Sequence, residues 1–177
     1  METLLIGIDF NVMNCNAVVA VKDGDKLFVI DEITKQNDTD ALAQEIKRRY
    51  PTNRILVYPD ASGAARSTIN ASKTDIAILE GYGFSSMALR SNPPIKDRVQ
   101  TLQALLENSK GWVRLAIHAS CRRLIECLEL QSYDEKSGDP DKQNGYDHLN
   151  DALGYLVYRE FNIIHARAGR RTGIRIY

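Results

Sequence analysis

Four aspartates lie where carboxylates could perform chemistry. Asp9 belongs to the apolar run LLIGIDF, which is typical of a strand buried on both faces. Asp60 directly follows a second run of this kind, RILVYP. Asp147 and Asp151 are four residues apart in a predicted helix, so they share one face of it. The chain therefore offers a strand aspartate, a strand-end aspartate and a helix pair, in that order.

Such carboxylates need a positive partner. An ionised aspartate in an apolar strand costs several kcal/mol unless its charge is compensated, and clustered carboxylates add mutual repulsion. Magnesium and manganese ions favour carboxylate and water oxygens. Two such ions about 3.5–4 Å apart can activate a water and stabilise the leaving oxygen in phosphodiester hydrolysis. We therefore expect Mg²⁺ or Mn²⁺, in a two-ion arrangement, at Asp9, Asp60 and the Asp147/Asp151 pair.

Each aspartate also has a simpler interpretation. Asp60 precedes Ala-Ser-Gly and could be a turn or cap residue. Asp147 could serve only the dipole of its helix, and Asp151 could lie on a solvated face. Asp9 could bond a neighbouring hydroxyl or lysine. It is the ordered combination of the four that favours the metal-site hypothesis.

Hydrophobic periodicity predicts the elements that position these residues. Strands are predicted at 4–10, 17–21, 27–33, 54–58, 84–89 and 113–117. Helices are predicted at 38–49, 72–82, 96–108, 121–130 and 146–164. Asp23-Gly24 indicates a tight turn between the second and third strands. Three consecutive strands followed by alternating helices and strands predict an α/β fold with a mixed central β-sheet.

The bulk composition sets few limits on function. The 177 residues suit a single domain over 1–177, and the 23 basic and 23 acidic side chains balance. The basic residues are unevenly placed, because the segment 165–177 carries four arginines and no acid. The three cysteines form no CxxC pair, and no apolar run approaches a membrane span. We expect an intracellular protein without a membrane segment.

Three motifs carry a family resemblance. IGIDFN at 6–11, VYPDASG at 57–63 and YDHLNDALGY at 146–155 resemble the three acidic motifs of the nuclease domain of phage terminase large subunits of the headful-packaging type. The segment NPPIKDRVQTLQALL at 92–106, followed by a helix containing Cys121, is also typical of that domain. The first motif alone is common among ribonuclease H-like and actin-like proteins, whereas the ordered set is specific.

The resemblance implies a ribonuclease H-like fold and Mg²⁺- or Mn²⁺-dependent cleavage of concatemeric double-stranded DNA during packaging. It implies that Asp9 and Asp60 are the first two motif acids. Many relatives have two adjacent aspartates after a histidine in the third motif, where this chain has YDH. Asp147 and Asp151 therefore both stay candidates, and His148 is a candidate auxiliary residue.

The family normally joins this domain to an ATPase motor, and the chain has no G-x-x-x-x-G-K-[ST] loop. We expect the C-terminal part of a longer terminase large subunit, monomeric when isolated. The resemblance implies a terminase small subunit and a portal protein as partners, in the cytoplasm of the host cell.

Cleaving DNA also requires cations that hold its phosphates. The candidate DNA-binding residues are Arg66, Arg90, Lys96 and Arg98. For each of them, a solvated surface charge is the simpler interpretation.

Three other functions compete with that of a packaging nuclease. A junction-resolving nuclease of the same fold would use the same acids. An actin-like ATP-binding domain would need a glycine- and serine-rich phosphate turn after Asp9, and the chain reads FNVMN there. A non-catalytic DNA-binding or docking module would be expected to lack some of the motif acids, which are all present.

Overall fold

The computed structural model describes residues 2–11, 14–64, 74–135 and 137–161. Its strands are β1 (Thr3–Asp9), β2 (Cys15–Asp23), β3 (Lys26–Gln36), β4 (Arg54–Pro59), β5 (Ser85–Ser86) and β6 (Leu115–Ile117). Its helices are α1 (Thr39–Arg49), the 3₁₀ turn η1 (Ala61–Ala64), α2 (Asp75–Gly81), α3 (Ile95–Leu106), α4 (Arg122–Leu130) and α5 (Asp147–Phe161). No helix among these residues is long and apolar enough to cross a membrane.

The six strands form one mixed sheet in the order β5-β4-β1-β2-β3-β6. β1, β2 and β3 are an antiparallel meander, whereas β4 runs parallel to β1 and β6 parallel to β3. A parallel neighbour requires a crossover, and α1 supplies it between β3 and β4. The α/β architecture with a mixed sheet, predicted from the periodicity, is confirmed.

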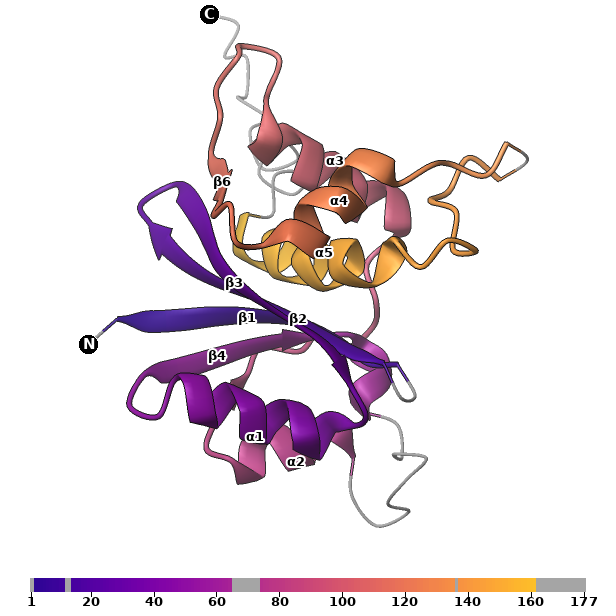
Figure 1. The fold of residues 1–177 in the computed structure, drawn as a ribbon. Helices are drawn as coiled ribbons and strands as arrows, with labels where there is room; N and C mark the ends of the chain where they lie inside the picture. The colour runs from indigo at the N-terminus through magenta and orange to yellow at the C-terminus, as the bar shows by residue number, and fades with distance from the viewer. Residues whose placement is uncertain (1, 12–13, 65–73, 136, 162–177) are drawn as a thin grey trace, which may run out of the picture.

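Helices cover both faces of the sheet (Figure 1). α1 and α2 lie on one face, and α3, α4 and α5 lie on the other. Side chains alternate along β1 accordingly: Ile6 and Ile8 belong to the core under α1 and α2, whereas Leu5 belongs to the core under α5. This alternation decides which strand residues can meet α5.

Local signals explain several boundaries. The Asp38 carboxylate accepts a hydrogen bond from the Ala41 N–H at 2.7 Å and caps α1, as expected of an aspartate N-cap. Thr74 caps α2 through the Ala77 N–H, and Gly24 takes a positive φ of 57° in the β2–β3 turn.

The strand predicted at 84–89 is much shorter than expected. Only Ser85 and Ser86 pair with β4, and the Met87 N–H makes the last bond to this strand, to the Val57 carbonyl. The chain then turns away toward α3 through Pro93 and Pro94, which have no N–H to continue a ladder. The predicted helix at 72–82 begins at Asp75 in the described part, and the end predicted at 164 lies outside it.

Candidate active site at the ends of β1 and β4

The carboxyl ends of β1 and β4 place Asp9 beside Asp60. In the parallel register Ile8 pairs with Pro59, and the Asp60 N–H donates to the Ile8 carbonyl at 3.1 Å. The two aspartates are thus neighbours on adjacent strands, which lie about 4.8 Å apart in a sheet. Both side chains contact α5, through His148 and Tyr155.

Helix α5 brings the third motif onto the same end of the sheet. Asp147, Asp151 and Tyr155 are spaced by four residues, so they form one stripe along the helix. The helix approaches β1 closely at Gly7, where an added Cβ would lie 2.1 Å from the Ala152 carbonyl oxygen. A glycine in β1 therefore allows α5 to carry its carboxylates up to the two strand ends.

Asp9 is buried and bonded to His148. It is 7% exposed, and its Oδ2 lies 3.0 Å from the His148 Nδ1. Burial raises the pKa of Asp9, the bond to His148 lowers it, and the charges of Asp151 and Asp60 raise it further. The bond to Asp9 raises the pKa of His148, against the effect of burial. The neighbouring carboxylates therefore raise the pKa of Asp9, and the bond to His148 partly offsets this effect.

Asp60 is held by the segment that leads into α3. Its Oδ1 accepts from the Asn92 Nδ2 at 2.9 Å and from the Ser62 N–H at 2.5 Å. The Asn92 amide oxygen in turn accepts from the Ala61 N–H at 2.8 Å. The Tyr155 hydroxyl lies 3.4 Å from Oδ2 on the other side. These contacts fix a carboxylate that the turn after β4 alone would leave free to rotate.

The two aspartates of α5 have different environments. Asp151 accepts from the Arg98 Nη1 at 2.8 Å. Asp147 is 5% exposed, and its Oδ1 has no hydrogen-bond partner among the described residues. The Lys142 ammonium lies 3.8 Å from an Asp151 oxygen and 4.0 Å from an Asp147 oxygen.

The donor set suits a hard divalent cation. Within the described ranges no three acidic, histidine or cysteine side chains are grouped closely enough to hold one ion, and three of the acids are each hydrogen-bonded to a partner within the protein. Yet the donors are carboxylate oxygens, one buried Asp147 oxygen accepts no hydrogen bond in this part of the chain, and burial together with neighbouring carboxylates raises the pKa of Asp9. Buried carboxylates of this kind favour magnesium or manganese.

A sequence model of the terminase RNase H-like domain matches residues 6–160 of the chain. The chain belongs to this family. The match includes both strand-end aspartates and the whole carboxylate stripe of α5, so the resemblance seen in the three acidic motifs is confirmed. No curated protein sequence matches the chain.

Solved structures of large terminases share the fold of this RNase H-like terminase domain. The P22 large terminase nuclease domain superposes with a TM-score of 0.65 at 18% identity, over 88% of this chain and 81% of that one. The nuclease domain of the large terminase of bacteriophage SPP1, solved with bound manganese, gives 0.60 at 18% identity, over 89% and 86%. A large terminase from a thermophilic bacteriophage gives 0.68 at 17% identity, over 89% of this chain. The chain spans only 39% of that thermophilic phage protein.

The predicted DNA-binding residues of the terminase domain have different placements. Arg90 and Lys96 are exposed, on either side of the Asn92 that binds Asp60. Arg66 lies outside the described residues. Arg98 does not fit the predicted DNA contact, because it is 5% exposed and bonded to Asp151. Its spacing in α3 turns it inward onto α5, where it meets a carboxylate of the site and not a phosphate on the surface.

Sequence reasoning missed three residues that contact the acids. Asn92 binds Asp60, Tyr155 packs between Asp60 and Arg98, and Lys142 approaches the α5 pair. Tyr155 could have been found from its spacing of four residues after Asp151. Asn92 and Lys142 lie in irregular segments, for which the periodicity gives no face.

The His148–Asp9 pair should make stability depend on pH. The pKa of His148 is raised above its ordinary 6.5, so the stability it contributes is complete below 6.5 and is lost as pH rises through the folded value. We expect His148→Gln to lower the free energy of unfolding by about 1–2 kcal/mol at about pH 6, and by less at about pH 9. Urea unfolding without metal at both pH values measures this. The matched control is His118→Gln, on an exposed residue, and an equal loss at both pH values would contradict the expectation.

Proposed function

We propose that this domain is a divalent-metal-dependent endonuclease that hydrolyses phosphodiester bonds of concatemeric double-stranded DNA during viral genome packaging. The observation that carries the proposal is the pairing of Asp9 with Asp60 at adjacent parallel strand ends, opposite the carboxylates of α5. On a terminase RNase H-like domain, a site of this composition fits metal-dependent hydrolysis of a phosphodiester. It fits this reaction better than hydrolysis by a nucleophilic side chain of the protein.

We infer that Asp9, Asp60 and Asp151 hold Mg²⁺ or Mn²⁺, as two ions, with Asp147 as a further oxygen donor. Asp151 is preferred as the main α5 ligand because its charge, with that of Asp60, acts on Asp9. Bound there, such ions would supply activation of water and stabilisation of the leaving oxygen.

The chain's own residues prepare the site. His148 orients Asp9 and can hold a proton at Nδ1. Asn92 and Tyr155 orient Asp60 from two sides. Exposed Arg90 and Lys96 flank this region and can bind phosphates of the DNA backbone.

The biological setting follows from the same proposal. The chain corresponds in length to about two fifths of the thermophilic phage large terminase, which was also solved with ADP and with ATP-γ-S. We infer that the domain works as the C-terminal part of a longer terminase large subunit with an ATPase motor. Its partners would be double-stranded DNA, a terminase small subunit and a portal protein, in the host cytoplasm. By itself the domain is expected to be a monomer.

Conversion of supercoiled plasmid to nicked and linear DNA tests the activity. We expect cleavage with added Mg²⁺ or Mn²⁺ and none with a chelator. Absence of cleavage with both metals at concentrations where the protein is folded would reject the endonuclease assignment for the domain.

The same assay should show a preference between the metals. Magnesium demands near-ideal octahedral geometry, and here three acids are each hydrogen-bonded to a partner within the protein, which restricts the directions in which they can meet an ion. We expect Mn²⁺ to give faster cleavage than Mg²⁺, about tenfold at equal concentration, since it tolerates less regular coordination. The measurement is the initial rate over a titration of each metal, and equal or faster cleavage with Mg²⁺ would contradict it.

A further inference from the structure

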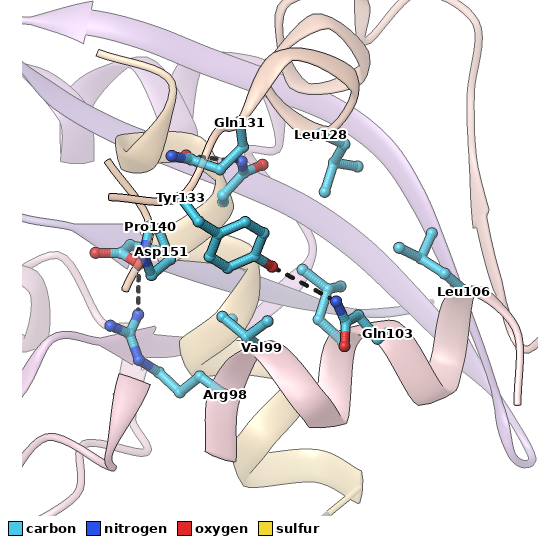
Figure 2. A pocket seen from close by; sticks show the side chains of 12 residues that line it. Arg98, Val99, Gln103, Leu106, Leu128, Gln131, Tyr133, Pro140 and Asp151 are labelled. Atoms are coloured by element: carbon cyan, nitrogen blue, oxygen red, sulfur yellow. Dashed lines mark hydrogen bonds and ion pairs between the residues drawn. The ribbon is translucent and has the colours of Figure 1, made fainter. Parts of the chain in front are cut away.

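Arg98 is a buried cation on the wall of the acidic site. It lies in the first turns of α3 and is 5% exposed, and its Nη1 donates to Asp151 at 2.8 Å. Its guanidinium carbon lies 4.4 Å from the ring centroid of Tyr155, which places it over the ring. Figure 2 shows the Arg98 side chain reaching from its helix to the Asp151 carboxylate.

Through these two contacts Arg98 is linked to two acids that lie on different elements. It holds Asp151 directly, and it stacks on Tyr155, whose hydroxyl lies 3.4 Å from Asp60. An arginine fork and a flat aromatic ring both restrict rotation. The pair therefore links a helix carboxylate to a strand-end carboxylate through two contacts of limited freedom.

A purely structural role explains this arrangement poorly. Burying a charged pair seldom adds net stability, because desolvation offsets the attraction. The Arg98 Nε has no hydrogen-bond partner among the described residues, so the guanidinium is not fully satisfied. Apolar side chains of similar volume are often as stabilising as a buried ion pair, or more so.

Space is available for Asp151 to turn away. Arg98 and Asp151 both line a cavity of about 280 Å³ between α3, α5 and the segment around Tyr133 (Figure 2). Without the Arg98 bond, the Asp151 carboxylate can rotate into this space, away from Asp9.

We propose that Arg98, stacked on Tyr155, is a positioning residue that fixes Asp151 and Asp60 in the separation needed to bind divalent metal. The proposal rests on the proposed function, because it concerns the same site. Arg98 acts through the two carboxylates and does not contact the substrate.

A second cation near Asp151 allows a matched comparison with Arg98. Lys142 also approaches Asp151, at 3.8 Å, but its side chain is 61% exposed. It contributes charge to the site without a fixed geometry. Removing Arg98 or Lys142 therefore deletes the same charge near the same carboxylate, but only Arg98 also supplies orientation.

Only the Arg98 variant should weaken metal binding. We expect Arg98→Gln to weaken Mn²⁺ binding by about 10- to 100-fold, the range found when partners that orient metal ligands are lost. We expect Lys142→Gln to leave Mn²⁺ binding unchanged or to tighten it by about two- to fivefold, because a repelling charge has gone. Calorimetric titration of the folded, metal-free chain with Mn²⁺ alone gives both affinities, and Lys26→Gln at the exposed first residue of β3 controls for charge.

Tighter or unchanged Mn²⁺ binding by folded Arg98→Gln would overturn the proposal, since charge alone would then describe Arg98. Arg98→Lys keeps the charge but loses the planar fork, and we expect it to recover only part of the affinity. If Arg98→Gln does not fold, Tyr155→Leu removes the ring beneath the guanidinium and should weaken Mn²⁺ binding in the same direction. Unchanged binding in Tyr155→Leu would then reject the positioning role.

The outcomes also separate this proposal from the proposed function. Wild-type protein that cleaves DNA and binds Mn²⁺, with Arg98→Gln binding equally well, would reject only the role of Arg98. Wild-type protein that binds no divalent metal would reject both, since no metal ligands would then need positioning.

Discussion

Replacing Asp9 by asparagine should lower metal-dependent DNA cleavage by about a thousandfold or more, because it removes a ligand charge at the centre of the site. Asn keeps the shape of Asp9 and can still accept a hydrogen bond from His148. The same substitution at Asp60, its neighbour across the β1–β4 register, should have a comparable effect. The measurement is the initial rate of plasmid nicking at saturating Mn²⁺.

The stability of Asp9→Asn should change in the opposite sense. The folded pKa of Asp9 is raised, mainly by burial, so its ionised form costs stability above that pKa and the cost disappears as pH falls through it. Without metal at neutral pH, we therefore expect Asp9→Asn to unfold at an equal or higher urea concentration than wild type. Asp25→Asn, in the exposed β2–β3 turn, is the matched control for both measurements. Wild-type cleavage by a folded Asp9→Asn would refute its role as a metal ligand.

Gly7→Ala should destabilise the domain by about 3 kcal/mol, as expected when a methyl group is forced into a packed interior. The added Cβ would lie 2.1 Å from the Ala152 carbonyl oxygen and 3.2 Å from the Leu156 Cβ. A backbone carbonyl within a helix cannot rotate aside, so α5 must move away from β1. Urea unfolding at neutral pH measures the loss.

The same shift should reduce cleavage, because it moves the α5 carboxylates relative to Asp9. A misplacement of about 1 Å can cost about a hundredfold in rate, and we expect a loss of that order in Gly7→Ala at a temperature where it is folded. The control is Gly81→Ala at the end of α2, where an added Cβ meets nothing within 4 Å. Wild-type stability and cleavage in Gly7→Ala would show that the close contact of α5 with β1 is not required.

The elements of the fold could largely be predicted from local patterns. Near-continuous apolar runs predicted β1 and β4, and four-residue spacing predicted the shared face of Asp147 and Asp151. These signals are local, because burial on two faces and helical periodicity are both visible within one segment. The two-residue length of β5 could not be predicted in this way. The strand ends where its pairing with β4 ends, and not where its own composition changes.

The sequence by itself determined the types and the order of the acids, the elements that carry them and the family to which the chain belongs. Only the tertiary structure decided how those acids are held. The parallel register set Asp9 beside Asp60, the absence of a side chain at Gly7 let α5 approach, and packing of α3 on α5 turned Arg98 inward. Partners separated by 53 residues, as Arg98 and Asp151 are, leave no mark on local spacing. Their contact depends on how two helices pack, and that is a property of the whole core.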